Sequence, residues 1–102
     1  MIIFNTTFHV EDDVLNDYIN FMKETYIIRA ASSGFLHEPR FARIHARHEE
    51  SGSSYSLQFS VKNVETLNHW FSSEGEILQG ELASRFGDKA LGFVTLLEEI
   101  EL

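Results

Sequence analysis

Polar side chains that could bind a ligand or transfer a proton recur at alternate positions in three stretches of this sequence. They are Asn5, Thr7 and His9, then Arg43, His45 and Arg47, then Ser56, Gln58 and Ser60. Imidazole groups transfer protons and bind metals, and guanidinium groups form paired hydrogen bonds with carboxylates and phosphates. Successive side chains of a β-strand point to opposite faces, so each set lies on one face of its strand.

The elements that carry these stripes follow from the hydrophobic pattern. Residues 2–10 alternate as a strand, with large apolar side chains opposite the polar stripe. From residue 11 an acidic start leads into apolar residues at helical spacing, and Gly34 ends this long helix. Its inner side is predicted to carry Val14, Tyr18, Phe21, Met22 and Thr25.

Residues 40–61 are predicted to form a β-hairpin with its turn at residues 49–54. In the first strand of this hairpin, the small apolar residues Ala42, Ile44 and Ala46 are expected to face the helices. The opposite face of that strand would carry Phe41, Arg43, His45 and Arg47. In the returning strand, Tyr55, Leu57, Phe59 and Val61 form the apolar face.

A second helical region follows, with Asn63 as its N-cap. The pattern Ser73-x-x-Glu76 matches a capping box and predicts a break near residues 72–75 with a new helix after it. Residues 91–97 are apolar on both faces, which predicts a last strand that is buried on both sides.

The predicted order is therefore strand, helix, strand, strand, helix, strand in one domain spanning residues 1–102. This is the split βαβ pattern of α+β ferredoxin-like proteins, a four-stranded antiparallel sheet with helices on one face. The polar stripes are left on the other face. That open face is the candidate ligand-binding surface, with Asn5, Thr7, His9, Arg43, His45, Arg47 and Gln58 as its residues.

Composition excludes several classes of function. Sixteen acidic residues against eight basic ones give a net charge of −8, so nucleic-acid binding is not expected. The chain has no cysteine, which excludes disulfides and thiolate chemistry. No stretch approaches the ~20 apolar residues of a membrane span, and no signal peptide is visible. We expect a cytoplasmic protein with no membrane partner.

A metal or cofactor is not expected within one subunit. His9 and His45 share a face in this interpretation, but their strands are separated by a third, and a site built from two subunits stays open. Arg43, His45 and Arg47 could bind an anion. The alternative, which the excess of acids favours, is that they pair with Glu49, Glu50, Glu98 or Glu99.

Two uses of the open face compete. It is either a solvated sheet face or the contact surface of a symmetric homodimer in which two sheets pack together. Ile3, Phe41 and one side of the last strand would be awkward in water. We therefore expect the homodimer.

Five segments together resemble an uncharacterised family of small bacterial proteins of the Bacteroidetes type. They span essentially the whole chain and read NTTFHVED, YIIRAASSG, RFARIHARHEE, SYSLQFSV and RFGDKALGFVTLLEE. That family is similar to the dimeric α+β barrels, which include antibiotic-biosynthesis monooxygenases, haem-degrading monooxygenases and isomerases. The resemblance implies the fold and a homodimer, but no reaction. Asn5 with His69 and Trp70 is a partial match to residues that oxygenases of this superfamily use.

The sequence thus favours a non-catalytic module that binds a small anionic or amphipathic molecule or a protein partner. The alternative is a small enzyme of the cofactor-independent monooxygenase, haem-degrading or isomerase type that works through Asn5, His9 or His45. A pocket lined by one of these side chains would favour the enzyme, and a fully paired interface would favour the module.

Overall fold

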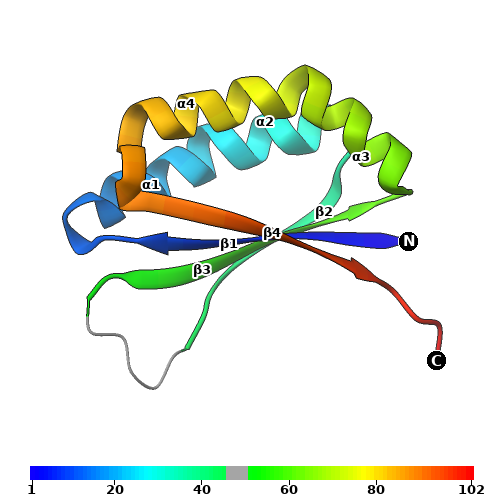
Figure 1. The fold of residues 1–102 in the computed structure, drawn as a ribbon, viewed down its shortest axis with the longest axis horizontal. Helices are drawn as coiled ribbons and strands as arrows, with labels where there is room; N and C mark the ends of the chain where they lie inside the picture. The colour runs from blue at the N-terminus through cyan, green and yellow to red at the C-terminus, as the bar shows by residue number, and fades with distance from the viewer. Residues whose placement is uncertain (46–50) are drawn as a thin grey trace.

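Four strands form one antiparallel sheet in the order β2-β3-β1-β4. The computed structural model describes residues 1–45 and 51–102. The strands are β1 (Ile2–Val10), β2 (His37–Arg43), β3 (Ser53–Val61) and β4 (Ala90–Glu98). Two helical segments cover one face of this twisted sheet, and no helix or strand of the described residues covers the opposite face (Figure 1). The predicted α+β ferredoxin-like fold is confirmed.

The first helical segment is continuous but changes its pitch halfway. It consists of η1 (Asp12–Val14), α1 (Leu15–Phe21), the π-helical η2 (Met22–Tyr26) and α2 (Ile27–Ser32). A π-turn holds an extra residue, so it rotates the side chains that follow. The predicted inner residues Tyr18, Phe21 and Met22 are buried. At the end of the π-turn Tyr26 is buried, while Thr25 before it is only half-buried.

The second helical segment begins as predicted and then departs from the prediction. It consists of α3 (Val64–Trp70), the π-helical η3 (Phe71–Gly75), α4 (Glu76–Phe86) and the 3₁₀ turn η4 (Gly87–Lys89). The Asn63 side chain accepts a hydrogen bond from the Thr66 backbone N–H at 2.8 Å, which confirms the N-cap. The predicted break at residues 72–75 is wrong, because the backbone stays helical and Ser73 donates its hydroxyl back to the His69 carbonyl at 2.7 Å.

Packing explains why the helix continues through Gly75. A Cβ atom added there would lie 2.7 Å from the Trp70 ring, so only glycine lets the helix pass over this side chain. Gly75 has ordinary helical dihedrals, with φ −63° and ψ −41°. The glycine therefore marks close packing and not the end of a helix.

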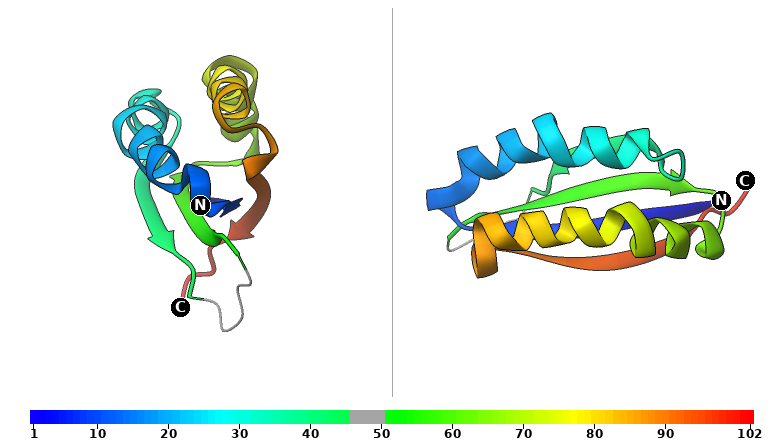
Figure 2. Two further views of the ribbon diagram at one scale, coloured as in Figure 1. Left: turned by 90° about the vertical axis from the view of Figure 1, so that its left-hand side faces the viewer. Right: turned by 90° about the horizontal axis from the view of Figure 1, so that it is seen from above.

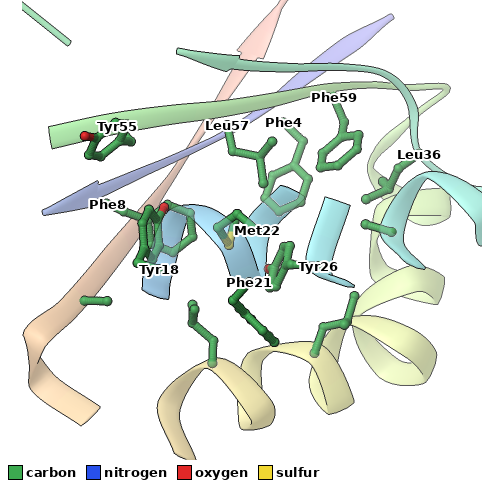
Figure 3. Close-up of a cluster of buried hydrophobic side chains, with 14 of the residues drawn as sticks. Phe4, Phe8, Tyr18, Phe21, Met22, Tyr26, Leu36, Tyr55, Leu57 and Phe59 are labelled. Carbon is green, nitrogen blue, oxygen red and sulfur yellow. The ribbon is translucent and has the colours of Figure 1, made fainter. Parts of the chain in front are cut away.

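The core lies between the helical segments and the sheet. The inner faces of β1 and β3 carry the predicted apolar residues, including Phe4, Phe8, Leu57 and Phe59. Aromatic rings from the first helical segment meet them, as Tyr18 does with Phe8 at 5.7 Å between ring centroids (Figure 3). Aromatic pairs at this spacing add to the stabilisation from buried area.

Strand β2 has the opposite face assignment from the one predicted. Phe41 pairs with Leu57 and its ring lies 6.2 Å from that of Tyr18, so it faces the helices. Ala42 is exposed on the other side. Burying an aromatic ring yields more free energy than burying alanine, and a register shift between His37 and Arg40 permits this alignment.

The two helical segments lie side by side over different halves of the sheet. The segment with α1 and α2 covers the β2–β3 half, and the segment with α3 and α4 covers the β1–β4 half (Figure 2). Arg29 links them, with its guanidinium 2.8 Å from carboxylate oxygens of both Glu74 and Glu81. Among the described residues, no helix has both the length and the apolar character needed to cross a bilayer.

Candidate functional site

Four of the predicted site residues lie together on the open face, which we define as the sheet face opposite the helices. These are Asn5, Thr7, His9 and Gln58. The Ser56 hydroxyl donates to the Asn5 side-chain oxygen at 2.6 Å, and the Asn5 amide donates to the Thr7 hydroxyl at 3.1 Å. These polar groups therefore already pair with one another.

Of the other three predicted site residues, Arg43 does not join them. Arg43 pairs with Tyr55, which puts it on the helix side, and it donates to the Ser53 hydroxyl at 3.4 Å. Its prediction as an open-face residue is wrong, for the reason given for Phe41. His45 follows the end of β2. Arg47 lies outside the described residues, as do Ala46, His48, Glu49 and Glu50.

Arg40 takes the place on the open face that Arg43 was expected to fill. It pairs with Gln58, and a shallow hollow of about 260 Å³ surrounds it. The hollow is lined by Ile3, Glu38, Arg40, Gln58, Ser60 and Glu99. Two acidic side chains, Glu38 and Glu99, therefore lie in this hollow at the rim of the open face.

Strand β4 is the least covered element of the fold. It pairs only with β1, and its side chains beyond Ala90 are exposed on both faces in the single chain. Phe93 is 64% exposed on the open face, and Leu96 is 44% exposed on the helix side. The predicted burial on both sides is therefore not achieved within one chain.

A groove runs between α4 and β4, and we call it the edge groove. It encloses about 300 Å³ and is lined by Thr6, Phe8, Tyr26, Gln79, Leu82, Gly92, Phe93 and Val94. Apolar side chains dominate this lining, and hydroxyl and amide groups come from Thr6, Tyr26 and Gln79. A mostly apolar cleft with a few polar groups is typical of a small-molecule site.

Local structure explains how the edge groove is formed. The π-turn η2 ends at Tyr26 and directs it into the core beside the groove. Gly92 leaves room because a Cβ there would lie 2.7 Å from the Phe8 ring. Burial raises the pKa of Tyr26 to about 12, so its hydroxyl stays protonated and able to donate a hydrogen bond at neutral pH.

Sequence reasoning missed the groove residues Tyr26, Gln79 and Gly92. A glycine inside an apolar strand does signal a close backbone approach, and that signal was present at Gly92. Nothing local marks Tyr26, because a regular α-helix would have turned Thr25 inward instead.

The partial match to oxygenases is not assembled as one site. Trp70 is fully buried and its ring lies 5.7 Å from that of Phe4, which faces the helices. Asn5 follows Phe4 and points to the opposite face, and His69 is exposed. In the described part of the chain, no three His, Asp or Glu side chains gather as a metal site would require.

The sheet order and the helices on one face define the class of this protein as α+β ferredoxin-like. Residues 1–100 match the family described as a domain of unknown function, DUF4286, and the chain belongs to this family. The family resemblance seen in the sequence is thereby confirmed, while a bacterial origin stays a prediction. No curated protein matches the sequence significantly.

Solved structures with this fold include three that cover nearly the whole chain. HapK from Hahella chejuensis has a TM-score of 0.74 at 7% identity, covering 98% of this chain and 93% of HapK. An antibiotic biosynthesis monooxygenase-type protein from Deinococcus radiodurans has a TM-score of 0.72 at 10% identity, covering 100% of this chain and 95% of that protein. A dimeric ferredoxin-like protein from an uncultured marine organism has a TM-score of 0.60 at 8% identity, covering 100% of this chain and 95% of that protein. At these identities the likeness shows the fold alone.

Proposed function

We propose that this protein is a homodimer that binds a small, uncharged amphipathic molecule in the edge groove. The observation that carries the proposal is the composition of the groove lining. Of the described residues that form it, none carries a charge at neutral pH, and three offer hydroxyl or amide groups among apolar walls. Such a site selects a flat apolar body with one or two hydrogen-bonding groups.

This proposal narrows the ligand class expected from the sequence, which was anionic or amphipathic. An anion needs a cationic or multiple-donor partner when it leaves water. Arg43 bonds Ser53, and Arg29 is held by two carboxylates on the outside of the helices. A neutral ligand is therefore better matched to the groove.

Three features support a homodimer through the open face. Apolar side chains of Ile3, Leu91, Phe93 and Leu97 line one part of it. None of the open-face positions on β1, β3 and β4 is acidic, although the chain has sixteen acidic residues, so the centre of this face holds no like charges that would repel a second copy. One similar structure is itself a dimeric ferredoxin-like protein.

The enzyme alternative would use Asn5, His9 or His45, and none of these lines the edge groove. Asn5 is already engaged by Ser56 and Thr7. Catalysis by Asn5 or His9 would need a substrate on the open face, where the proposed homodimer places the second copy. The cytoplasmic location expected from the sequence stays part of this proposal.

The test compares two probes that share a naphthalene ring and differ in charge, 2-naphthol and 2-naphthoate, by isothermal titration calorimetry. We expect 2-naphthol to bind one site per chain and 2-naphthoate to bind at least about tenfold more weakly, because its carboxylate loses water without gaining a cation. Tyr26→Phe should weaken 2-naphthol binding about two- to tenfold through the loss of one hydrogen bond.

Matched variants of α4 locate the site. Gln79→Phe fills the groove and should abolish 2-naphthol binding. Ser84→Phe places the same side chain at an exposed position of α4 outside the groove lining, and should leave binding unchanged. Equal binding of the two probes, or no effect of Gln79→Phe, would contradict the proposed site.

A further inference from the structure

Strand β4 belongs to the edge groove and to the proposed dimer surface at the same time. Gly92 and Val94 line the groove from the helix side of the strand, and Leu91 and Leu97 lie on the open face. Phe93 contributes to both, because it pairs with Thr7 on the open face and also forms part of the groove wall. The outer wall of the groove is thus a strand that the dimer partner would contact.

Support for β4 within one chain is one-sided. Backbone hydrogen bonds join it to β1, and two more lie at its ends, from Glu11 N–H to Lys89 at 2.9 Å and from Glu99 N–H to Met1 at 3.1 Å. Among the described residues its other edge has no partner strand, and its side chains beyond Ala90 are exposed on both faces. An exposed apolar surface of this kind is one that another chain can cover.

The two edges of the sheet differ, because the β2 edge has features that hinder contact with another chain and β4 lacks them. Strand β2 carries Pro39, which has no N–H to donate, and a register shift between His37 and Arg40. Glu38 lies in the left-handed region with φ 53°. Proline and bulges are the devices that blunt an edge strand. No proline or register shift occurs along β4.

We infer that a second copy of this chain, seated on the open face, covers Phe93 and holds β4 in place as the outer wall of the edge groove, so that ligand binding and dimerisation strengthen each other. The inference rests on the function proposed above. A partner that holds β4 in place removes part of the ordering cost that a ligand would otherwise meet, and the ligand does the same for the partner. Because linkage is reciprocal and each dimer holds two sites, the dimer dissociation constant must change by the square of the factor by which dimerisation changes the ligand affinity of each site.

The experiment measures the dimer dissociation constant by sedimentation equilibrium, with and without saturating 2-naphthol. We expect the constant to fall about fivefold or more when 2-naphthol is bound. In Gln79→Phe, whose groove is filled, the probe should leave the constant unchanged.

The reciprocal measurement compares 2-naphthol affinity in dimer and monomer. Leu91→Lys places a charge on the open face outside the groove lining and should yield a monomer that binds 2-naphthol about fivefold or more weakly. Wild-type protein titrated above and below its dimer dissociation constant gives the same comparison without a substitution. If 2-naphthol binds wild type but its affinity is the same for monomer and dimer in both comparisons, the linkage is overturned and the proposed ligand site in the edge groove is retained. If 2-naphthol does not bind at all, both proposals fall.

Discussion

Two buried tyrosines illustrate how single residues set the chemistry of this core. Tyr18 is fully buried, and its hydroxyl has no hydrogen-bond partner among the described residues. Tyr26 is also buried but lines the edge groove. Burial raises the pKa of both side chains, since the phenolate form cannot be solvated inside the core. The two residues differ in that Tyr26, and not Tyr18, is among the residues that line the edge groove.

Tyr18→Phe should therefore keep or increase stability, by up to about 1 kcal/mol, because it removes a buried polar group that gains nothing. It should also weaken the pH dependence at high pH. A tyrosine whose pKa is raised by burial costs the fold no free energy of ionisation below its unfolded value of 10.0, and the folded state loses stability as the pH rises above that value, because the unfolded chain then ionises more readily than the folded one. Denaturant unfolding of wild type and variant at pH 8 and above pH 10 measures both effects. A loss of more than about 1 kcal/mol at pH 8 would show that the hydroxyl has a stabilising role.

At the scale of elements, two glycines of the second helical segment have opposite roles. Gly75 is buried beneath Trp70, and a Cβ there would lie 2.7 Å from the ring. Gly80 lies in α4 with no atom within 4 Å of the position of a Cβ. The first glycine is needed for packing, and the second only adds freedom to the unfolded chain.

Gly75→Ala should destabilise the protein by about 1–3 kcal/mol through overpacking against Trp70. Gly80→Ala should stabilise it by about 0.5–1 kcal/mol, because alanine favours the helix and restricts the unfolded chain. Denaturant unfolding of the pair tests this difference in one helix. Equal changes in the two variants would contradict the packing role of Gly75.

At the scale of the whole molecule, the uncovered half of the fold is the open face with β4. Its internal hydrogen bonds, such as that from Ser56 to Asn5, let polar groups be buried without losing partners. Leu91 and Phe93 supply apolar area on the same face. A self-complementary surface of this kind suits a two-fold dimer.

Sedimentation at micromolar concentration should show one species of twice the 11.7 kDa chain mass. Leu91→Lys should weaken the dimer at least about tenfold, since each copy would bury an unpaired charge. Arg43→Met should leave the dimer intact, because the structure places Arg43 on the helix side. A monomeric wild type, or a dimer lost on Arg43→Met, would contradict this assignment.

Much of the fold follows from the sequence alone. The order of elements, the inner faces of β1 and β3 and the Asn63 cap depend on side-chain period and local hydrogen bonds, which a sequence displays directly. For the same reason Asn5, Thr7, His9 and Gln58 could be placed on one face.

Tertiary structure alone decided the rest. The face of β2 was set by the burial of Phe41 and a register shift, against the pattern of Ala42 and Ile44. The capping signal at Ser73 lost to the packing of Gly75 on Trp70, and a π-turn brought Tyr26 inward. The edge groove arises where these residues meet Gly92 of β4, far away in the chain. Such contacts join distant segments, and their free energy outweighs the local preferences that a sequence pattern records.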